Sequence, residues 1–295
     1  MAWWQLTVQC SREELEQVED TLLELGALSI TIGDAEDEPI YEPLPGDTPL
    51  WSNSTVTGLF DQSRGIEDLY DDLVNKLPSK LVPSISHHQL EDQVWERVFL
   101  ERYHPVKFGN NLWVCPGWHT PPEPNACNII LDPGIAFGTG GHATTALCLE
   151  FLDAHPPRDL SVIDYGCGSG ILAIAAHKLG ASQLRCVDID PQALQASADN
   201  AERNGIDASA LNISTPEQLS RDPADYLMAN ILSGPLIELE PHFASLCKPG
   251  AQLLLSGILE QQADDICQTY ATHFELDPVT HKDGWCRVSG IRNNR

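Results

Sequence analysis

The pattern of apolar and polar positions separates the chain into two parts that are organised differently. In the first ninety residues, four short apolar-rich stretches predict strands, and two stretches with apolar residues at helical spacing predict helices. The predicted strands are 3–9, 28–32, 55–60 and 84–90, and the predicted helices are 15–25 and 66–77. Strand, helix and strand, repeated once, predict a ferredoxin-like α+β domain over residues 1–91.

From residue 126 to residue 295, short apolar strands alternate with helical patterns, which is typical of an α/β fold with a largely parallel sheet. The predicted strands are 128–131, 162–165, 184–187, 210–213, 226–229, 253–255, 274–276 and 286–291, and the predicted helices are 146–152, 171–179, 191–204 and 261–273. A turn at Asp283 and Gly284 predicts a closing hairpin that adds an antiparallel strand. Residues 92–125 are interpreted as a linker that begins with a helix over 92–103.

A glycine-rich turn joins the strand at 162–165 to the helix that follows it. Its spacing is Gly-x-Gly-x-Gly, from Gly166 through Gly168 to Gly170, with the acidic Asp164 two residues ahead. Such a turn brings backbone N–H groups at a helix N-terminus close to a ligand. The nicotinamide-dinucleotide fingerprint would need a further glycine at position 171, which is Ile171.

Two polar residues follow later strands of the same predicted sheet. Asp188 lies 22 residues beyond Gly166, where a carboxylate can accept both ribose hydroxyl hydrogens of an adenosine. Asn230 ends the strand at 226–229, where its side-chain oxygen can accept a hydrogen bond from an amine. The competing interpretations are an acid beside a helix for Asp188 and a turn asparagine for Asn230.

A second glycine-rich stretch, residues 132–145, precedes the helix at 146–152. It can fold over a ligand and offer backbone N–H groups and hydroxyls. The alternative is a plain connection in which Thr144 or Thr145 is the helix N-cap. His142 is interpreted as a packed, hydrogen-bonded side chain in preference to a functional group.

Composition and charge narrow the classes of function. The net charge is −26, from 43 acidic and 17 basic side chains, and such a surface disfavours direct binding to nucleic acid. Residues 1–100 hold 20 of the acidic and 5 of the basic residues, which suits a basic protein partner, although solubility or a salt-adapted host would also explain the charge. No basic segment precedes an apolar one at the start of the sequence, and every apolar run is far shorter than a membrane span, so we expect neither a secretory signal nor a transmembrane segment. Nine scattered cysteines lack metal-ligand spacing, so we expect no metal and a cytoplasmic location.

Three stretches in order match one family, and the strand end Val-Asp-Ile-Asp-Pro lies between the last two. They are Asp-Pro-Gly-Ile-Ala-Phe-Gly-Thr-Gly-Gly-His-Ala-Thr-Thr, Asp-Tyr-Gly-Cys-Gly-Ser-Gly-Ile-Leu-Ala-Ile-Ala-Ala and Asn-Ile-Leu. Over its whole length the chain resembles the PrmA family, which methylates large-subunit ribosomal protein eleven. The resemblance implies a Rossmann-like class I methyltransferase sheet of seven strands. It also implies methyl transfer from S-adenosylmethionine to the N-terminal α-amine and lysine ε-amines of that protein, up to trimethylation. The N-terminal domain is expected to capture the substrate, and the enzyme is expected to be a monomer.

The resemblance also implies roles for individual residues. Asn230 is the expected catalytic residue. The expected cofactor-binding residues are Thr145, Gly166, Asp188, Asn230, Phe137, Gly138, Thr139 and Gly168. One departure is visible, because the family pattern Gly-Thr-Gly-Thr-His-Pro reads Gly-Thr-Gly-Gly-His-Ala here, which puts in doubt any side-chain contact at Gly141 and Ala143.

Three alternatives stay open. A methyltransferase acting on another amine or amide, such as a release-factor glutamine, would be expected to carry Asn-Pro-Pro-Tyr where this chain has Asn230-Ile231-Leu232-Ser233. An oxidoreductase that binds NAD is opposed by Ile171 and by the closing hairpin. A non-catalytic adenosine-binding protein is opposed by the complete set of expected cofactor contacts.

Overall fold

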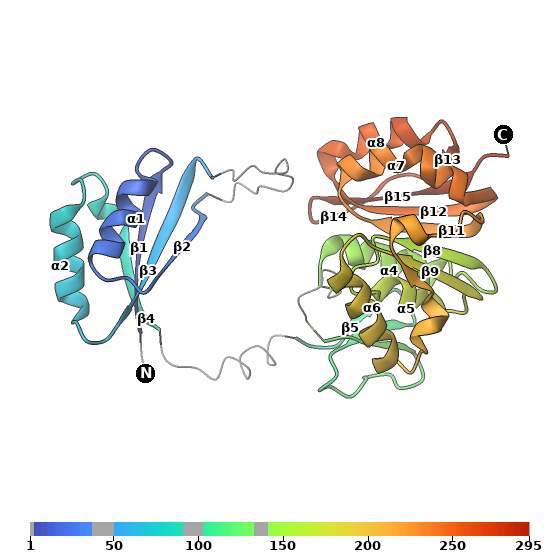
Figure 1. Ribbon diagram of the computed structural model, residues 1–295, viewed down its shortest axis with the longest axis horizontal. Helices are drawn as coiled ribbons and strands as arrows, with labels where there is room; N and C mark the ends of the chain where they lie inside the picture. Colours follow the sequence, from blue (N-terminus) through green and yellow to red (C-terminus); the bar gives the residue numbers. More distant parts are fainter. Residues whose placement is uncertain (1–2, 37–49, 91–102, 133–140, 295) are drawn as a thin grey trace. The chain divides into compact units, whose positions relative to one another are not determined.

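The computed structural model describes residues 3–36, 50–90, 103–132 and 141–294, and it divides the chain into two compact units (Figure 1). The first unit is Met1–Leu100 and the second is Glu101–Arg295. The predicted linker helix at 92–103 falls almost entirely outside the described residues.

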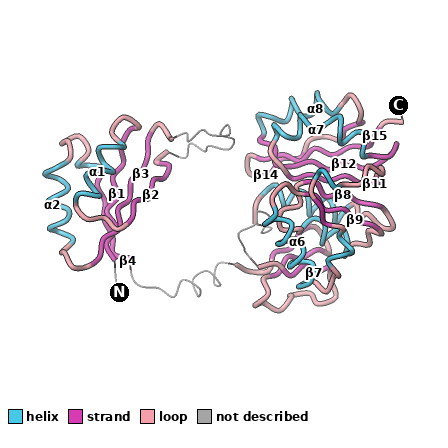
Figure 2. The backbone as a smooth tube through the Cα atoms, in the orientation of Figure 1, coloured by secondary structure: helices cyan, strands magenta, loops and turns pink. Residues whose placement is uncertain are grey.

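In the first unit, four antiparallel strands form a sheet in the order β2-β3-β1-β4, and two helices cover one of its faces (Figure 2). The elements are β1 (Trp3–Ser11), α1 (Leu15–Glu24), β2 (Ser29–Asp34), β3 (Asn53–Asp61), α2 (Ile66–Lys76), a 3₁₀ turn (Val82–Ser84) and β4 (Ile85–Leu90). The helices bury Leu22 and Leu69 against Leu6, Val8 and Val56 of the central strands. This order is that of a ferredoxin-like unit, in agreement with the sequence pattern.

The N-cap position of α1 belongs to Glu14, although Ser11 is the residue type that is usually favoured as an N-cap. The Ser11 hydroxyl donates to the Glu14 carboxylate at 2.6 Å. Gly26, with φ of 94°, lies just beyond the C-terminal end of α1, where a left-handed residue is favoured.

The second unit contains a twisted sheet in the order β10-β9-β8-β11-β12-β15-β13, with β14 paired to β15. The strands are β8 (Ser161–Tyr165), β9 (Gln183–Val187), β10 (Ile213–Ser214), β11 (Ala224–Asn230), β12 (Cys247–Leu259), β13 (Phe274–Leu276), β14 (Thr280–Lys282) and β15 (Trp285–Arg292). Strands β8 to β12 run parallel and β15 runs antiparallel to β12. Asp283 and Gly284, both with positive φ, make the tight β14–β15 turn that the sequence predicts.

A smaller sheet in the same unit joins β5 (Val106–Phe108), β6 (Leu112–Cys115) and β7 (Cys127–Ile130). Thus β5 and β6, which come from the stretch interpreted as a linker, pair with each other, and β6 also pairs with β7 within this unit.

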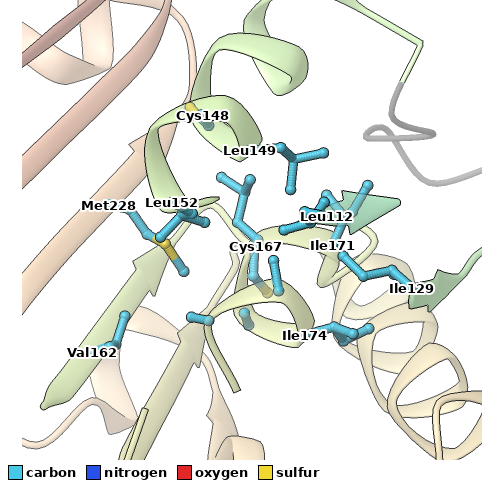
Figure 3. Close-up of a cluster of buried hydrophobic side chains, with 14 of the residues drawn as sticks. Leu112, Ile129, Cys148, Leu149, Leu152, Val162, Cys167, Ile171, Ile174 and Met228 are labelled. Atoms are coloured by element: carbon cyan, nitrogen blue, oxygen red, sulfur yellow. The ribbon is translucent and has the colours of Figure 1, made fainter. Parts of the chain in front are cut away.

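Helices cover both faces of the large sheet (Figure 1). The helices are α4 (Ala143–Ala154), α5 (Ile171–Lys178), α6 (Pro191–Arg203), α7 (Ser233–Leu246) and α8 (Ala263–Tyr270). The face under α4, α5 and α6 buries Val162 and Met228 (Figure 3), whereas the face under α7 and α8 buries Ile163 and Leu227. Neighbouring residues of one strand thus enter opposite cores, as the pleat requires.

Two elements differ from the sequence prediction. The strand predicted at 210–213 is mostly a 3₁₀ turn (Ala208–Leu211), because Asp207 caps its start and Asn212, with φ of 44°, ends it. The helix α7 has no counterpart in the prediction, since it contains Pro235 and, in its interior, Pro241. Tertiary burial of its Phe243 face compensates for the hydrogen bond that Pro241 removes.

Candidate active site

The glycine turn between β8 and α5 adopts a backbone that only glycine takes without strain. The φ angles of Gly166, Gly168 and Gly170 are 75°, 54° and 77°. The N–H groups of Gly166 and Cys167 both donate to the carbonyl of Val187, at 2.7 and 3.0 Å. These bonds tie the turn to the end of the neighbouring strand β9.

Packing, as well as the backbone angle, restricts position 166 to glycine. A Cβ atom there would lie 2.2 Å from Cγ2 of Ile231, which is closer than any real contact. Ile231 directly follows Asn230, so the glycine turn and the end of β11 are in contact. The predicted cofactor residues Gly166 and Gly168 are therefore brought to the carboxyl edge of the sheet beside Asn230.

Asp164 lies beneath this turn and is almost completely buried. Its Oδ2 accepts a hydrogen bond from the backbone N–H of Ala173 at 3.0 Å, whereas its Oδ1 is buried without a hydrogen-bond partner among the described residues. Burial raises the pKa of this carboxyl, the Ala173 hydrogen bond lowers it, and the nearby carboxylate of Asp188 raises it, which together give a pKa of about 7.

This shift predicts a pH-dependent stability that Asp164→Asn removes. The native pKa of about 7 lies above the ordinary value of 3.8, so the native state holds the proton more tightly than the unfolded state. The raised pKa contributes to the free energy of unfolding, and this contribution is fully present below the unfolded-state pKa. It is lost as pH rises through about 7, which lowers the free energy of unfolding by up to about 4 kcal/mol. Urea unfolding without ligand should show wild type losing stability relative to Asp164→Asn from about pH 4 to about pH 7 and a constant difference above. Parallel pH curves for the two proteins would contradict this explanation.

Asp188 stands at the carboxyl end of β9, where the sequence places it. One carboxylate oxygen accepts from the N–H of Gly168 at 2.9 Å, and the other accepts from the N–H of Asp190 at 3.0 Å. The side chain is half-buried, so lone pairs remain for two vicinal hydroxyls. Asp190 caps α6 by accepting from Gln192 N–H at 2.8 Å, as its place before Pro191 predicts.

Ile189, which sequence reasoning missed, follows Asp188 and is 82% exposed. An isoleucine this exposed between two acidic residues offers an apolar surface beside the carboxylate that would hold a ribose. The only signal in the sequence is a single apolar residue between Asp188 and Asp190, which is too common to identify a site.

Asn230 and Thr145 meet at the end of β11. The Asn230 Nδ2 group donates to Thr145 Oγ1 at 3.4 Å, and Thr145 is fully buried in the first turn of α4. The Asn230 Oδ1 atom is buried and has no hydrogen-bond partner among the described residues. A buried amide oxygen without a donor is costly, so this atom is ready to accept a hydrogen from a ligand.

The second glycine-rich stretch is described from Gly141 onward, so Phe137, Gly138 and Thr139 lie outside the described residues. The alternative in which Thr144 or Thr145 is the N-cap is wrong: His142 caps α4, accepting from Thr144 N–H at 3.4 Å. The imidazole also packs on Trp285, in agreement with a packed role. Among the described residues, a Cβ atom at Gly141 would meet nothing within 4 Å.

Within the described ranges, no group of three or more His, Cys, Asp or Glu side chains could hold a metal ion. In the same part of the chain, every helix is too short or too polar to cross a bilayer. The site is thus built from a glycine turn, one carboxylate and one amide, a set that can hold an adenosine and orient an amine.

Comparison with known proteins gives a match over nearly the whole chain. The family model for ribosomal protein L11 methyltransferase (PrmA) matches residues 2–293. Ribosomal protein L11 methyltransferases of Actinobacillus pleuropneumoniae serotype 5b and Azotobacter vinelandii are each 49% identical, over 99% of this chain and 100% of the relative. The crystal structure of ribosomal protein L11 methylase from Lactobacillus delbrueckii subsp. bulgaricus covers 65% of this chain and 100% of its own at 33% identity, with a TM-score of 0.59.

Proposed function

Because the chain belongs to the ribosomal protein L11 methyltransferase family, we propose that it methylates the N-terminal α-amine and lysine ε-amines of L11, up to three times per amine. The methyl donor is S-adenosylmethionine, which this family uses. The whole-chain match favours L11 over a release-factor glutamine as substrate. The observation that carries the site assignment is the buried Oδ1 of Asn230, which lacks a donor among the described residues. We place the reaction in the cytoplasm and the enzyme as a monomer.

The cofactor fits the residues at the carboxyl edge of the sheet. Gly166 and Gly168, which carry no side chain, would face it with their backbone atoms. The half-buried carboxylate of Asp188 would accept the ribose hydroxyls, and the exposed Ile189 would contact the adenine ring. Thr145 would fix the amide of Asn230, so that its oxygen points to the ligand.

The reaction needs a neutral amine nitrogen aligned with the methyl carbon. When bound, S-adenosylmethionine supplies an electrophilic methyl group on sulfur. Asn230 accepts an N–H hydrogen of the amine through Oδ1 and so directs the nitrogen lone pair. A free lysine is neutral in only about one molecule in a thousand at pH 7, so desolvation beside the buried amide would favour the neutral form. The released proton passes to solvent, and no side chain is assigned as a general base.

Replacing Asp188 by asparagine should weaken cofactor binding. The amide keeps one oxygen for Gly168 N–H, but its NH₂ group cannot accept a hydroxyl hydrogen. We expect the dissociation constant of S-adenosylmethionine to rise about ten-fold to hundred-fold, consistent with the loss of one or two charge-assisted hydrogen bonds. Isothermal titration calorimetry measures this, and Asp190→Asn, which preserves the helix cap, is the matched control. If both variants bound S-adenosylmethionine as tightly as wild type does, Asp188 would not be a cofactor-binding residue.

Residues 1–91 would act as the substrate-recognition domain, preceding a connecting segment at 92–125 and the catalytic domain at 126–295. The first hundred residues carry 20 acidic and 5 basic side chains, and a ribosomal protein is expected to be basic. Many of the carboxylates lie exposed on α1 and α2, the helical face of the first unit. The negative electrostatic potential of these carboxylates accelerates the encounter with a basic partner more than it strengthens the final complex.

Neutralising exposed acids of the first unit should therefore slow association with L11. The proposed variant combines Glu16→Gln, Asp20→Asn, Glu67→Gln and Asp68→Asn, all exposed on α1 and α2. Its matched control changes four exposed acids of the second unit, Glu202, Asp264, Asp265 and Glu275. Stopped-flow association of wild type should slow at least about ten-fold from low to high salt, and the first variant should lose more of that dependence than the control variant does. An equal effect of both variants would argue against steering by the first unit.

The substrate assignment is tested by mass spectrometry of L11 after incubation with the full chain and S-adenosylmethionine. We expect mass increases of one, two and three methyl groups on single amines, located by peptide fragmentation. Unchanged L11 under conditions where calorimetry shows cofactor binding would refute the substrate while leaving the cofactor site in place.

A further inference from the structure

An aromatic pair lies at the start of α4 and β15. The rings of His142 and Trp285 are 4.8 Å apart between centroids and inclined at 70°, an edge-to-face arrangement. The Nδ1 atom of His142 is 2.8 Å from Thr144 Oγ1, which fixes the imidazole as the cap of α4. Both side chains are half-buried, so part of each faces out of the core.

The fold places this pair beside Asn230. His142 and Thr145 are one helical turn apart on α4, and they contact Trp285 and Asn230 respectively. Strand β12 links the same two residues, because Asn230 pairs with Ser256 and Trp285 pairs with Leu259. Along the strands Trp285 is thus about three residues, or roughly 10 Å, beyond the level of Asn230, and across the sheet it is two strands away, with β12 between them. Figure 1 shows the β14–β15 hairpin beside α4, which contacts β12, β14 and β15.

Each methyl group that is added to the acceptor nitrogen removes an N–H hydrogen by which the site could hold it. A neutral primary amine carries two N–H hydrogens, a monomethylated amine carries one, and a dimethylated amine carries none. In each transfer an N–C bond forms as the S–C bond breaks, sulfur leaves as a neutral thioether, and a proton goes to water only in the first two. The Oδ1 atom of Asn230 can therefore hold the nitrogen by hydrogen bonding for two transfers but not for the third.

We propose that Trp285, braced by His142, contacts methyl groups already on the acceptor nitrogen and so determines how far methylation proceeds. This rests on the proposed function. Among aromatic rings the face of an indole attracts methylated ammonium groups most strongly, and that attraction persists when no N–H hydrogen is left. Burial lowers the pKa of His142, so its ring is neutral at pH 7 and does not repel the cationic product.

Trp285 and Asn230 should then matter at opposite ends of the reaction series, Trp285 for the third methyl transfer and Asn230 for the first. Trp285→Leu keeps an apolar side chain but removes the aromatic face, and it should lower the ratio of trimethylated to dimethylated amine about five-fold at matched total methyl transfer. Trp285→Phe should stay within about two-fold of wild type. Asn230→Ala should instead slow the first transfer most. Trp118→Ala, which removes an exposed tryptophan that also has a histidine beside it, is the control for loss of a tryptophan.

Mass spectrometry of intact L11 gives the distribution of methylation states. A second readout is binding: wild type should bind trimethylated L11 about five-fold more tightly than Trp285→Leu does, with equal affinity of both for S-adenosylmethionine. That equality shows that the variant is folded with its cofactor site intact. An unchanged distribution with wild-type activity would overturn the role of Trp285 and leave the proposed function standing, as would equal losses in Trp285→Leu and Trp285→Phe. Absence of any transfer by wild type would overturn both.

Discussion

Asn230→Ala is expected to reduce the rate of methyl transfer to L11 by about a hundred-fold to a thousand-fold while changing the affinity for S-adenosylmethionine much less. The reason is that the side-chain oxygen is buried without a donor among the described residues, so it makes its proposed bond only when an amine is present. Removing one preorganised polar group from a reacting centre has effects of this size. Rapid-quench measurement of a single turnover with saturating cofactor isolates the affected step.

Thr145→Val is the matched comparison for this prediction. It removes the hydroxyl that accepts from Asn230 Nδ2 but keeps the amide oxygen, so we expect a smaller loss of about ten-fold from poorer orientation of the amide. Full turnover of Asn230→Ala would exclude Asn230 from the reaction. A variant that lost only cofactor affinity would show that Asn230 binds the cofactor and does not orient the amine.

Gly166→Ala is expected to lower the affinity for S-adenosylmethionine by at least about a hundred-fold. The added methyl group meets Ile231 Cγ2 at 2.2 Å, so either the turn or the end of β11 must move. A displacement of about 1 Å at a site of this kind is enough for a loss of that size. Because Ile231 follows Asn230, the remaining activity at saturating cofactor should fall as well.

Gly205→Ala separates steric conflict from backbone strain. Gly205 has φ of 71°, close to the 75° of Gly166, but a Cβ atom there meets nothing within 4 Å. We expect this variant to lose about 1 to 2 kcal/mol of stability, since alanine adopts a left-handed backbone at that cost, and to bind the cofactor as wild type does. Denaturant unfolding and calorimetry on both variants give the comparison. Similar affinities for the two variants would show that contact with Ile231 is unimportant.

The parts of the fold that could be predicted are those in which local chemistry and tertiary packing agree. Val162 and Ile163 on β8 are apolar because helices cover both faces of the sheet, and the glycine turn after them follows from its spacing. The tight hairpin at Asp283 and Gly284 could be predicted because these residues tolerate positive φ. Helix α7 could not, since Pro241 opposes a helix locally and the helix is supported by tertiary burial of side chains such as Leu236 and Phe243.

The candidate site shows the same division. The positions of Asp188 and Asn230 could be predicted because Asp188 follows β9 and Asn230 ends β11, and parallel strands bring their carboxyl ends to one edge. The exposure of Ile189 and the contact between His142 and Trp285 could not be predicted. The first depends on which way one side chain points, and the second joins residues 143 positions apart.

The most direct test of the central claim is a crystal structure of the full chain with S-adenosylhomocysteine and a lysine-containing peptide from L11. We predict the ribose hydroxyls on the Asp188 carboxylate, the thioether sulfur near the glycine turn, and the lysine nitrogen within hydrogen-bond distance of Asn230 Oδ1. A bound nucleoside at any other place in the fold, or a lysine nitrogen held by residues other than Asn230, would contradict the account.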